Sequence, residues 1–166
     1  MNPKDPSRPV ASFRPNLNGC VAKDPRLARA TEECYQEELA SSAAYTYRSL
    51  LTESENPILA DRMDDFAVED AEHFRMLGKL ILALGCDPSV RARIFVGGDP
   101  RRPCSPLSIA TDALRQEQEQ IDRLQTLLGK SADRVVRSLL SYILADHSRR
   151  ISFLEEMARS QKPEMA

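Results

Sequence analysis

The sequence predicts an all-α protein whose helices pack as a single four-helix bundle. Its 166 residues are typical of one domain, and a composition with six glycines and 5% aromatic residues favours helix. At three places a polar residue followed by proline opens a long stretch of helical apolar periodicity. No strand-like alternation competes with this pattern.

The helix starts have a physical basis, because the cap side chain pairs a free N–H and proline has no N–H to leave unpaired. The three pairs are Asp24-Pro25, Asn56-Pro57 and Ser105-Pro106, and Ser131 can cap a fourth helix. These signals predict helices over residues 25–53, 57–84, 106–128 and 132–159. We expect an irregular arm over 1–23, the bundle over 24–160 and a tail over 161–166.

The segment 85–105 is much longer than the other two connections. A loop of that length is unusual in a compact domain unless it crosses the whole bundle. Short, long and short connections predict two antiparallel helix pairs joined by one crossover, which an up-down-up-down bundle would not need. Within it, the basic and then apolar stretch 91–98 can dock on the bundle or on a second subunit.

Charge and cysteine usage disfavour several classes of protein. A net charge of −2 gives no field that would attract nucleic acid or an anionic membrane. The polar start has no apolar signal segment and no stretch could span a bilayer, so we expect a soluble cytoplasmic protein. Cys20, Cys34, Cys86 and Cys104 form no CxxC pair, which argues against a zinc ribbon or rubredoxin-type iron centre. We expect these cysteines to be reduced thiols.

Polar residues interrupt the apolar stripe of the second predicted helix. At about 100° per residue, Asp70 and His73 fall inside the stripe formed by leucines, Met63 and Phe66. Glu69 and Glu72 point roughly 80–140° away and are interpreted as a solvated face. The inward motif is therefore Asp70-x-x-His73.

The third and fourth predicted helices show the same anomaly. Glu117 lies at the centre of the third stripe, and His147 lies near the centre of the fourth with Arg150 at its edge. Asp146 points off that stripe. The pair His147-x-x-Arg150 occupies the same two angular places on its helix that Asp70-x-x-His73 occupies on the second.

The first predicted helix gives a weaker signal. Its clearest apolar positions, Leu39, Ala43 and Leu50, sit roughly 100° or more from Glu38. Glu38 shares its side of the helix with Tyr45 and other small or aromatic residues, a face that can also point inward. Geometry alone leaves the orientation of Glu38 open.

Buried charges need partners, because moving a charge out of water costs several kcal/mol or more unless it is paired or metal-bound. One explanation is a set of buried salt bridges in which Arg150 and the two histidines pair with Asp70 and Glu117. The other is a metal site, which the gathering of both histidines of the chain favours.

The chain resembles a known family at several of these residues. Glu38 followed by Tyr45 is similar to the first ligand helix of the rubrerythrin, bacterioferritin and manganese-catalase branch of the ferritin-like superfamily. The segment 73–88, with its leucines and its Gly-Cys-Asp-Pro exit, resembles the family's Glu-x-x-His helix more strongly. Glu117 followed by Ile121 resembles the third-helix ligand. The resemblance covers residues from about 30 to 157 and is thin on the fourth helix.

In that family, two helices each give one Glu and two each give Glu-x-x-His, and together these ligands hold two iron or manganese ions. The resemblance therefore implies a ferritin-like four-helix bundle with a metal site formed by Glu38, Asp70, His73, Glu117 and His147. Tyr45 and Arg150 are implied as neighbours of the ligands.

This chain departs from the family at three places. Asp70 replaces a Glu, His147 replaces the second Glu and Arg150 replaces the second His. Arginine cannot ligate a cation, because it stays protonated and has no free lone pair. Glu38, Asp70 and Glu117 contribute three negative charges, and Arg150 contributes one positive charge. When both histidines are neutral, one divalent ion neutralises the remaining charge. We therefore expect at most one iron, manganese or zinc ion, and nothing indicates haem or a nucleotide.

Two functions follow from this reading. The first is a rubrerythrin-like metal-binding protein with weak peroxidase-like or ferroxidase-like oxidoreductase activity, which would need a separate electron-donor protein. The second is a metal-free pseudo-enzyme bundle that serves as a structural or interaction module. In either case the resemblance implies a homo-oligomer, a dimer or larger.

Overall fold

The computed structural model of the chain describes residue 17, residues 19–91 and residues 105–160. In this part of the chain the secondary structure is entirely helical. The helices are α1 (Pro25–Thr52), α2 (Pro57–Ala83), α3 (Pro106–Gly129) and α4 (Arg134–Ser160). The all-α prediction is confirmed, and the helices begin and end close to the predicted residues.

The predicted caps begin the first three helices. In each case the side chain of Asp24, Asn56 or Ser105 accepts a hydrogen bond from an N–H in the first turn. The start of α4 differs, because Asp133 caps it by accepting from the N–H groups of Val135 and Val136 at 2.8 and 3.0 Å. A carboxylate there also complements the positive end of the helix. The predicted cap Ser131 accepts from the N–H of Asp133 instead.

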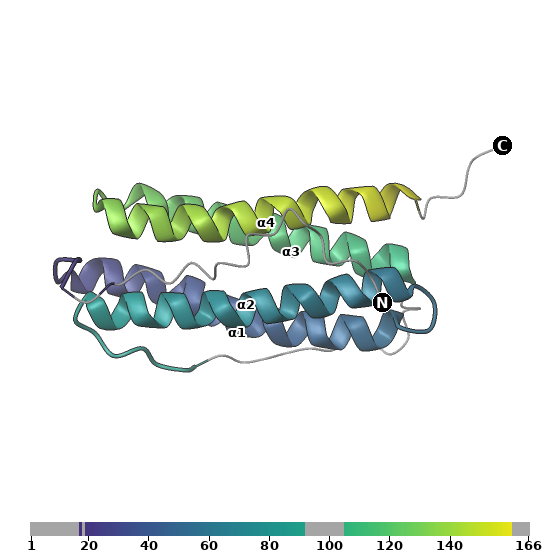
Figure 1. The fold of residues 1–166 in the computed structure, drawn as a ribbon, viewed down its shortest axis with the longest axis horizontal. Coiled ribbons are helices and arrows are strands. Elements are labelled where there is room, and N and C mark those ends of the chain that lie inside the picture. The colour runs from purple at the N-terminus through teal and green to yellow at the C-terminus, as the bar shows by residue number, and fades with distance from the viewer. Residues whose placement is uncertain (1–16, 18, 92–104, 161–166) are drawn as a thin grey trace.

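The four helices form two antiparallel pairs that pack as two layers (Figure 1). One layer holds α1 and α2, and the other holds α3 and α4. Helix α2 ends at one end of the bundle and α3 begins at the opposite end, so the connection between them spans the bundle. Residues 92–104, which include Cys104 and most of the stretch 91–98, lie outside the described residues.

The end of α2 is closed by a glycine motif. Gly85 has a φ of +92°, and the N–H of Cys86 donates to the carbonyl of Ile81 while the N–H of Gly85 donates to that of Leu82. This Schellman arrangement uses the left-handed conformation that glycine adopts without steric cost. It starts the crossover at the predicted position.

The core consists of two apolar clusters separated by a polar layer. One cluster includes Leu77, Leu80, Leu124 and Leu140, and the other includes Leu59, Met63, Ala110 and Leu154. On each of the four helices the polar residues fall between the two clusters in sequence, so they form a layer across the middle of the bundle. The most deeply buried residues of this layer are Glu38, Asp70, His73, Glu117, His147 and Arg150.

None of the four described helices combines the length and apolar character that crossing a membrane requires. Cys20, Cys34 and Cys86 are free thiols.

Candidate metal centre

Four side chains from α1, α2 and α4 converge in the polar layer. Glu38, Asp70, His73 and His147 each offer a ligand atom, and these atoms lie within 4.8 Å of one another. All four side chains are buried. The structure thus brings together four of the five ligands implied by the sequence, and it settles the open orientation of Glu38, which points inward.

Three atoms of this group have no hydrogen-bond partner in the described part of the chain. They are Oε2 of Glu38, Oδ2 of Asp70 and Nδ1 of His73. His73 Nδ1 lies 3.4 Å from Glu38 Oε2 and 3.9 Å from Asp70 Oδ1. Glu38, Asp70 and His73 are the ligands that the resemblance implies on the first and second helices, and their candidate ligand atoms lie within 4.8 Å of one another.

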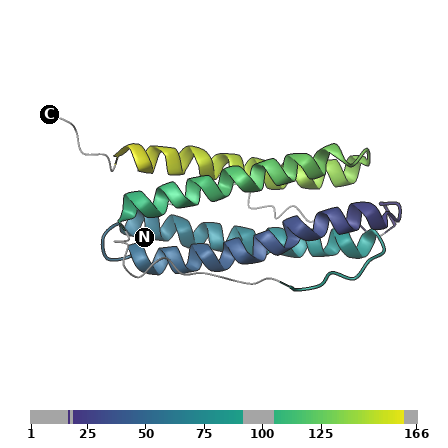
Figure 2. The ribbon, with the colours of Figure 1, turned by 180° about the vertical axis from the view of Figure 1, so that it is seen from behind.

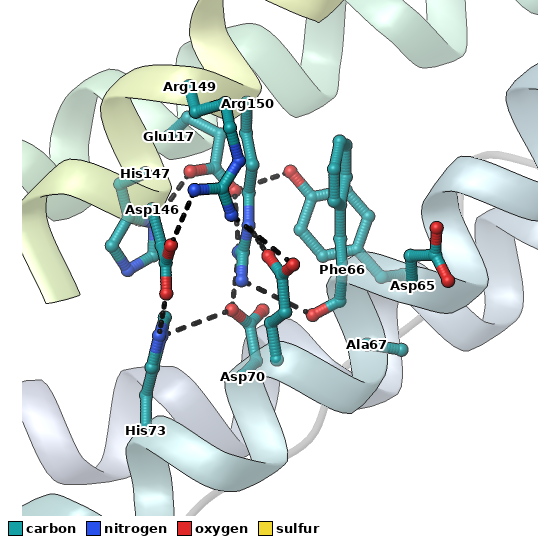
Figure 3. A network of polar contacts seen from close by, with 12 residues as sticks. Asp65, Phe66, Ala67, Asp70, His73, Glu117, Asp146, His147, Arg149 and Arg150 are labelled. Carbon is teal, nitrogen blue, oxygen red and sulfur yellow. Dashed lines mark hydrogen bonds and ion pairs between the residues drawn. The ribbon is translucent and has the colours of Figure 1, made fainter. Parts of the chain in front are cut away.

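Asp146 fixes the orientation of His73. Nε2 of His73 lies 3.0 Å from Oδ2 of Asp146, and Asp146 also pairs with Arg149 at 2.7 Å (Figure 3). A proton on Nε2 is donated to this carboxylate, which leaves Nδ1 to face Glu38 and Asp70. A carboxylate behind a histidine is the arrangement that orients metal-ligating imidazoles in proteins.

His147 bridges two carboxylates. Its Nδ1 lies 2.6 Å from Oε2 of Glu117, and its Nε2 lies 3.0 Å from Oε1 of Glu38. Burial alone would lower the pKa of His147, but Glu38 and Glu117 outweigh burial and raise this pKa to about 10. With both nitrogens donating to carboxylates, His147 is an imidazolium in the absence of a metal.

Arg150 is fully buried and joins α4 to α2 and α3. Its Nη1 donates to Oδ1 of Asp70 and, at 3.4 Å, to Oε1 of Glu117, while its Nε donates to Oε2 of Glu69 at 3.1 Å. Burial opposes its charge, but Asp70 and Glu117 hold the pKa of Arg150 well above its ordinary value. The contact with Glu117 and Asp70 that the sequence predicts for Arg150 is present.

Glu117 is fully engaged as a hydrogen-bond acceptor. Its Oε1 accepts from the hydroxyl of Tyr45 at 2.5 Å and from Arg150, and its Oε2 accepts from His147. Burial and the neighbouring Glu117 raise the pKa of Tyr45 well above its ordinary value, so this phenol keeps its proton. The structure places Glu117 in the ionic network and outside the group of four convergent ligand atoms.

Asp70 and Glu38 each divide their two oxygens between different environments. One oxygen of each carboxylate accepts from a cationic side chain, Arg150 or His147, and the other oxygen is the unpaired atom. Burial, with Glu38 and Glu117 adding to it, raises the pKa of Asp70 to about 7 against the opposing effect of Arg150. Burial would also raise the pKa of Glu38, but His147 and His73 lower it below its ordinary range.

Two acidic residues correct the sequence prediction. Glu69 and Asp146 were expected to point away from the core, yet both are buried and pair with arginines of α4. They lie at the edge of the inward stripes, where α2 and α4 face each other and long arginine side chains reach across. Glu72 is exposed, as predicted.

The sequence does carry a signal for these two residues. An acidic residue precedes the inward position on both helices, as Glu69-Asp70-x-x-His73 on α2 and Asp146-His147-x-x-Arg150 on α4. In the structure each acid contacts the last residue of the opposite motif: Asp146 contacts His73, and Glu69 contacts Arg150. Reading the two motifs as a pair would have predicted both contacts.

Comparison with solved structures shows the same architecture. The bacterioferritin of Rhodobacter capsulatus, solved with a metal-free dinuclear site and haem iron, matches with a TM-score of 0.73 and 17% identity, covering 84% of this chain and 88% of that one. The bacterioferritin of Mycobacterium tuberculosis matches with a TM-score of 0.71 and 21% identity, over 84% and 88% of the two chains. An open-pore ferritin from Archaeoglobus fulgidus matches with a TM-score of 0.69 and 15% identity, over 82% and 84%.

No curated protein sequence matches the chain significantly. The family model of the ferritin-like domain matches residues 29–161, which span all four helices. The chain therefore belongs to the ferritin-like domain family.

Proposed function

We propose that the chain binds one divalent transition-metal ion in its polar layer, on Glu38, Asp70 and His73. The observation that carries this proposal is the convergence of three buried atoms that have no hydrogen-bond partner: Glu38 Oε2, Asp70 Oδ2 and His73 Nδ1, of which the first and the last form only a long ion pair at 3.4 Å. Leaving one such atom without a partner costs roughly 1–3 kcal/mol. A single cation would satisfy all three atoms at once.

The donor set fits iron, manganese or zinc. Carboxylate oxygen and imidazole nitrogen are ligands that all three metals accept, and the group of convergent atoms contains no thiolate. Asp146 supports the same role, because its contact with Nε2 leaves Nδ1 of His73 available as the donor.

His147 is the fourth candidate ligand, and Glu117 is the weakest. His147 can donate to an ion only after Nε2 loses its proton and releases Glu38. Both oxygens of Glu117 are already engaged by His147, Tyr45 and Arg150, so we propose that Glu117 anchors these side chains.

Charge balance favours one ion over two. Five carboxylates, two arginines and two histidines make up the centre and its immediate partners. With both imidazoles protonated, the negative charges exceed the positive charges by one. A divalent ion that replaces only the proton of His73, with His147 still protonated, brings the balance to zero, whereas a second ion would leave an excess of two positive charges. Arg150 and His147 thus supply the positive charge that a second ion would provide.

One ion limits the chemistry to at most a weak ferroxidase or peroxidase activity. Dinuclear sites use both ions for two-electron reactions with oxygen or peroxide, and here guanidinium and imidazolium groups stand in for one of them. A bound iron or manganese ion would supply one-electron redox chemistry. The surrounding residues would orient the ligand carboxylates of Glu38 and Asp70 and exclude water from them. Tyr45 and Arg150 would keep their protons.

We propose a homo-oligomeric, cytoplasmic protein that receives electrons, if it uses them, from a separate donor protein. The likeness in fold to bacterioferritins supports the homo-oligomer, and the absence of a rubredoxin-type cysteine motif from the sequence supports the separate donor.

A metal-free structural module is the second candidate. It is favoured by the complete pairing of Glu117, His147 and Arg150, which forms an ionic core without any metal. Metal content decides between the two functions. We expect protein loaded separately with Fe(II), Mn(II) and Zn(II), then desalted, to retain one ion per chain, and a His73→Gln variant to retain none. The exposed Glu72→Gln variant is the matched control. Retention of no metal by the parent protein would favour the structural module.

A further inference from the structure

A recess lies between α1 and α3, the two helices on the near side in Figure 2. It is lined by Cys34, Glu37, Glu38, Gln120, Arg123 and Leu124, and the space among these residues, about 170 Å³, includes open solvent. Glu38 joins the recess to the metal centre, because the same carboxylate contacts His147 and faces His73. The recess therefore runs from the surface to a candidate ligand.

Gln120 projects into this recess without a hydrogen-bond partner. The residue is 3% exposed, and neither its Oε1 nor its Nε2 is paired within the described residues. A buried amide with no partner is costly, so the position calls for a polar ligand. The amide oxygen can coordinate a hard cation, and the amide nitrogen can only donate hydrogen bonds.

The charges around the recess favour a cation. Arg123 is the basic residue of the lining, and it already pairs with Glu37 at 3.3 Å and with Glu33 at 3.7 Å. The carboxylate of Glu38 at the inner end adds further negative charge. Burial, followed by the effect of Glu38, raises the pKa of Cys34 to about 12, so this side chain stays a neutral thiol. A neutral thiol and an amide bind cations weakly, so the recess suits the passage of a cation better than its stable binding.

Arg123 and Glu37 are the partly exposed residues of the lining, so their ion pair lies at the outer end of the recess. In the present arrangement the space is too narrow to hold a water molecule, so passage requires a side chain to move. The guanidinium of Arg123 spans from α3 to Glu33 and Glu37 of α1, and these pairs are partly exposed. Exposed ion pairs are weak, so the guanidinium can swing out at low cost.

We propose that this recess is the access route of the buried centre, in which Arg123 is the gate and Gln120 is a transient ligand for a divalent cation on its way to Glu38. This inference rests on the proposed metal site and adds to it the path by which the ion arrives.

The test is the rate of Zn(II) binding to the metal-free full-length protein, followed by stopped-flow competition with a chromogenic chelator. Gln120→Met keeps the length of the side chain and removes its polar atoms. We expect it to slow binding about tenfold, the effect of roughly 1.4 kcal/mol on a barrier. Arg123→Ala should speed binding by a similar factor. Gln118→Met and Arg115→Ala alter exposed residues of the same helix and should leave the rate within about twofold of the parent.

A second measurement reports on the gate without any metal. In a background in which Cys20, Cys86 and Cys104 are serine, the one remaining thiol is Cys34 in the recess. We expect Arg123→Ala to speed alkylation of Cys34 by iodoacetamide, whereas Arg115→Ala should not.

The outcomes separate this inference from the proposed metal site. If the parent binds one ion but Gln120→Met and Arg123→Ala bind it at the parent's rate, the access route is wrong and the metal site stands. If the parent binds no ion, the metal site is wrong and the access route is wrong with it. Unchanged alkylation of Cys34 in Arg123→Ala would contradict the role of Arg123 as the gate.

Discussion

Arg150 and Asp70 form a fully buried ion pair between α4 and α2, in which Nη1 of the arginine donates to Oδ1 of the aspartate. The arginine occupies the position where the sequence resemblance implies an imidazole ligand. Asp70 keeps its other oxygen unpaired and close to His73 and Glu38. One carboxylate therefore serves both the protein's own cation and, in our proposal, the metal ion.

The first prediction concerns the stability of the metal-free protein. Arg150→Leu should lower the free energy of unfolding by about 3–5 kcal/mol, because it leaves the charges of Asp70 and Glu117 without their partner. Chemical denaturation at pH 8 measures the loss. Arg149→Leu is the control, since the side chain of Arg149 is 48% exposed and its pairs are weaker. Equal stability of the Arg150 variant and the parent would show that Arg150 is not part of a buried network.

The second prediction concerns the residue behind His73. Asp146→Asn preserves the shape of the side chain but removes the charge that holds the Nε2 proton of His73. We expect metal affinity to fall by about 10–100-fold, as is usual when a carboxylate partner of a ligand histidine is lost. Isothermal titration with Zn(II) measures this, with the exposed Glu72→Gln as control. Unchanged affinity would mean that His73 is not a ligand or does not need Asp146.

The third prediction concerns pH. The pKa of His147 is raised to about 10 in the folded protein, against an ordinary value of about 6.5. A raised pKa contributes stability that is fully present below about pH 6.5 and is lost as the pH rises towards about 10. Metal-free protein should therefore lose stability across this range, and His147→Gln should lose less. Melting curves of both proteins from pH 6 to 10 measure the difference between their losses of stability. Cys34 is present in both proteins, so its titration cancels in this difference. Parallel curves for the two proteins would contradict the bridging imidazolium.

The fourth prediction restores the second half of the site. The double variant His147→Glu, Arg150→His replaces both internal cations with family-type ligands. We expect it to retain two ions per chain and to be less stable than the parent when metal-free. Arg150→His alone should raise metal content less, because His147 would still supply a positive charge beside Glu38 and Glu117. A double variant that still holds no more than one ion would show that charge is not what limits occupancy.

The sequence predicted the helices because their starts depend on local chemistry. A cap followed by proline acts within one turn, so Asp24, Asn56 and Ser105 could be identified without knowing the tertiary structure. Ser131 failed because a nearby carboxylate, Asp133, was the better cap for the last helix. The periodic stripes likewise placed Asp70, His73, Glu117, His147 and Arg150 correctly in the core.

The parts of the site that the stripes missed depend on contacts between helices. Leu50 is one of the clearest apolar positions of α1, yet it is 68% exposed, while the face with Tyr45 and Glu38, whose orientation the sequence left open, is buried. That face is inward because it meets the polar layer, which no single-helix stripe reveals. Glu69 and Asp146 are buried for a similar reason, because each meets a residue of the opposite helix across the seam between α2 and α4: Glu69 meets Arg150, and Asp146 meets His73.

The central claim is that the core holds one metal ion beside two internal cations. The most direct test is a crystal structure of protein loaded with excess Mn(II) or Zn(II), with anomalous differences collected at the absorption edge of the metal. We predict one peak per chain, bounded by Glu38 Oε2, Asp70 Oδ2 and His73 Nδ1, with Arg150 still in contact with Asp70. Two peaks about 3.5–4 Å apart, the spacing of two-metal sites, or no peak in the polar layer would contradict the claim.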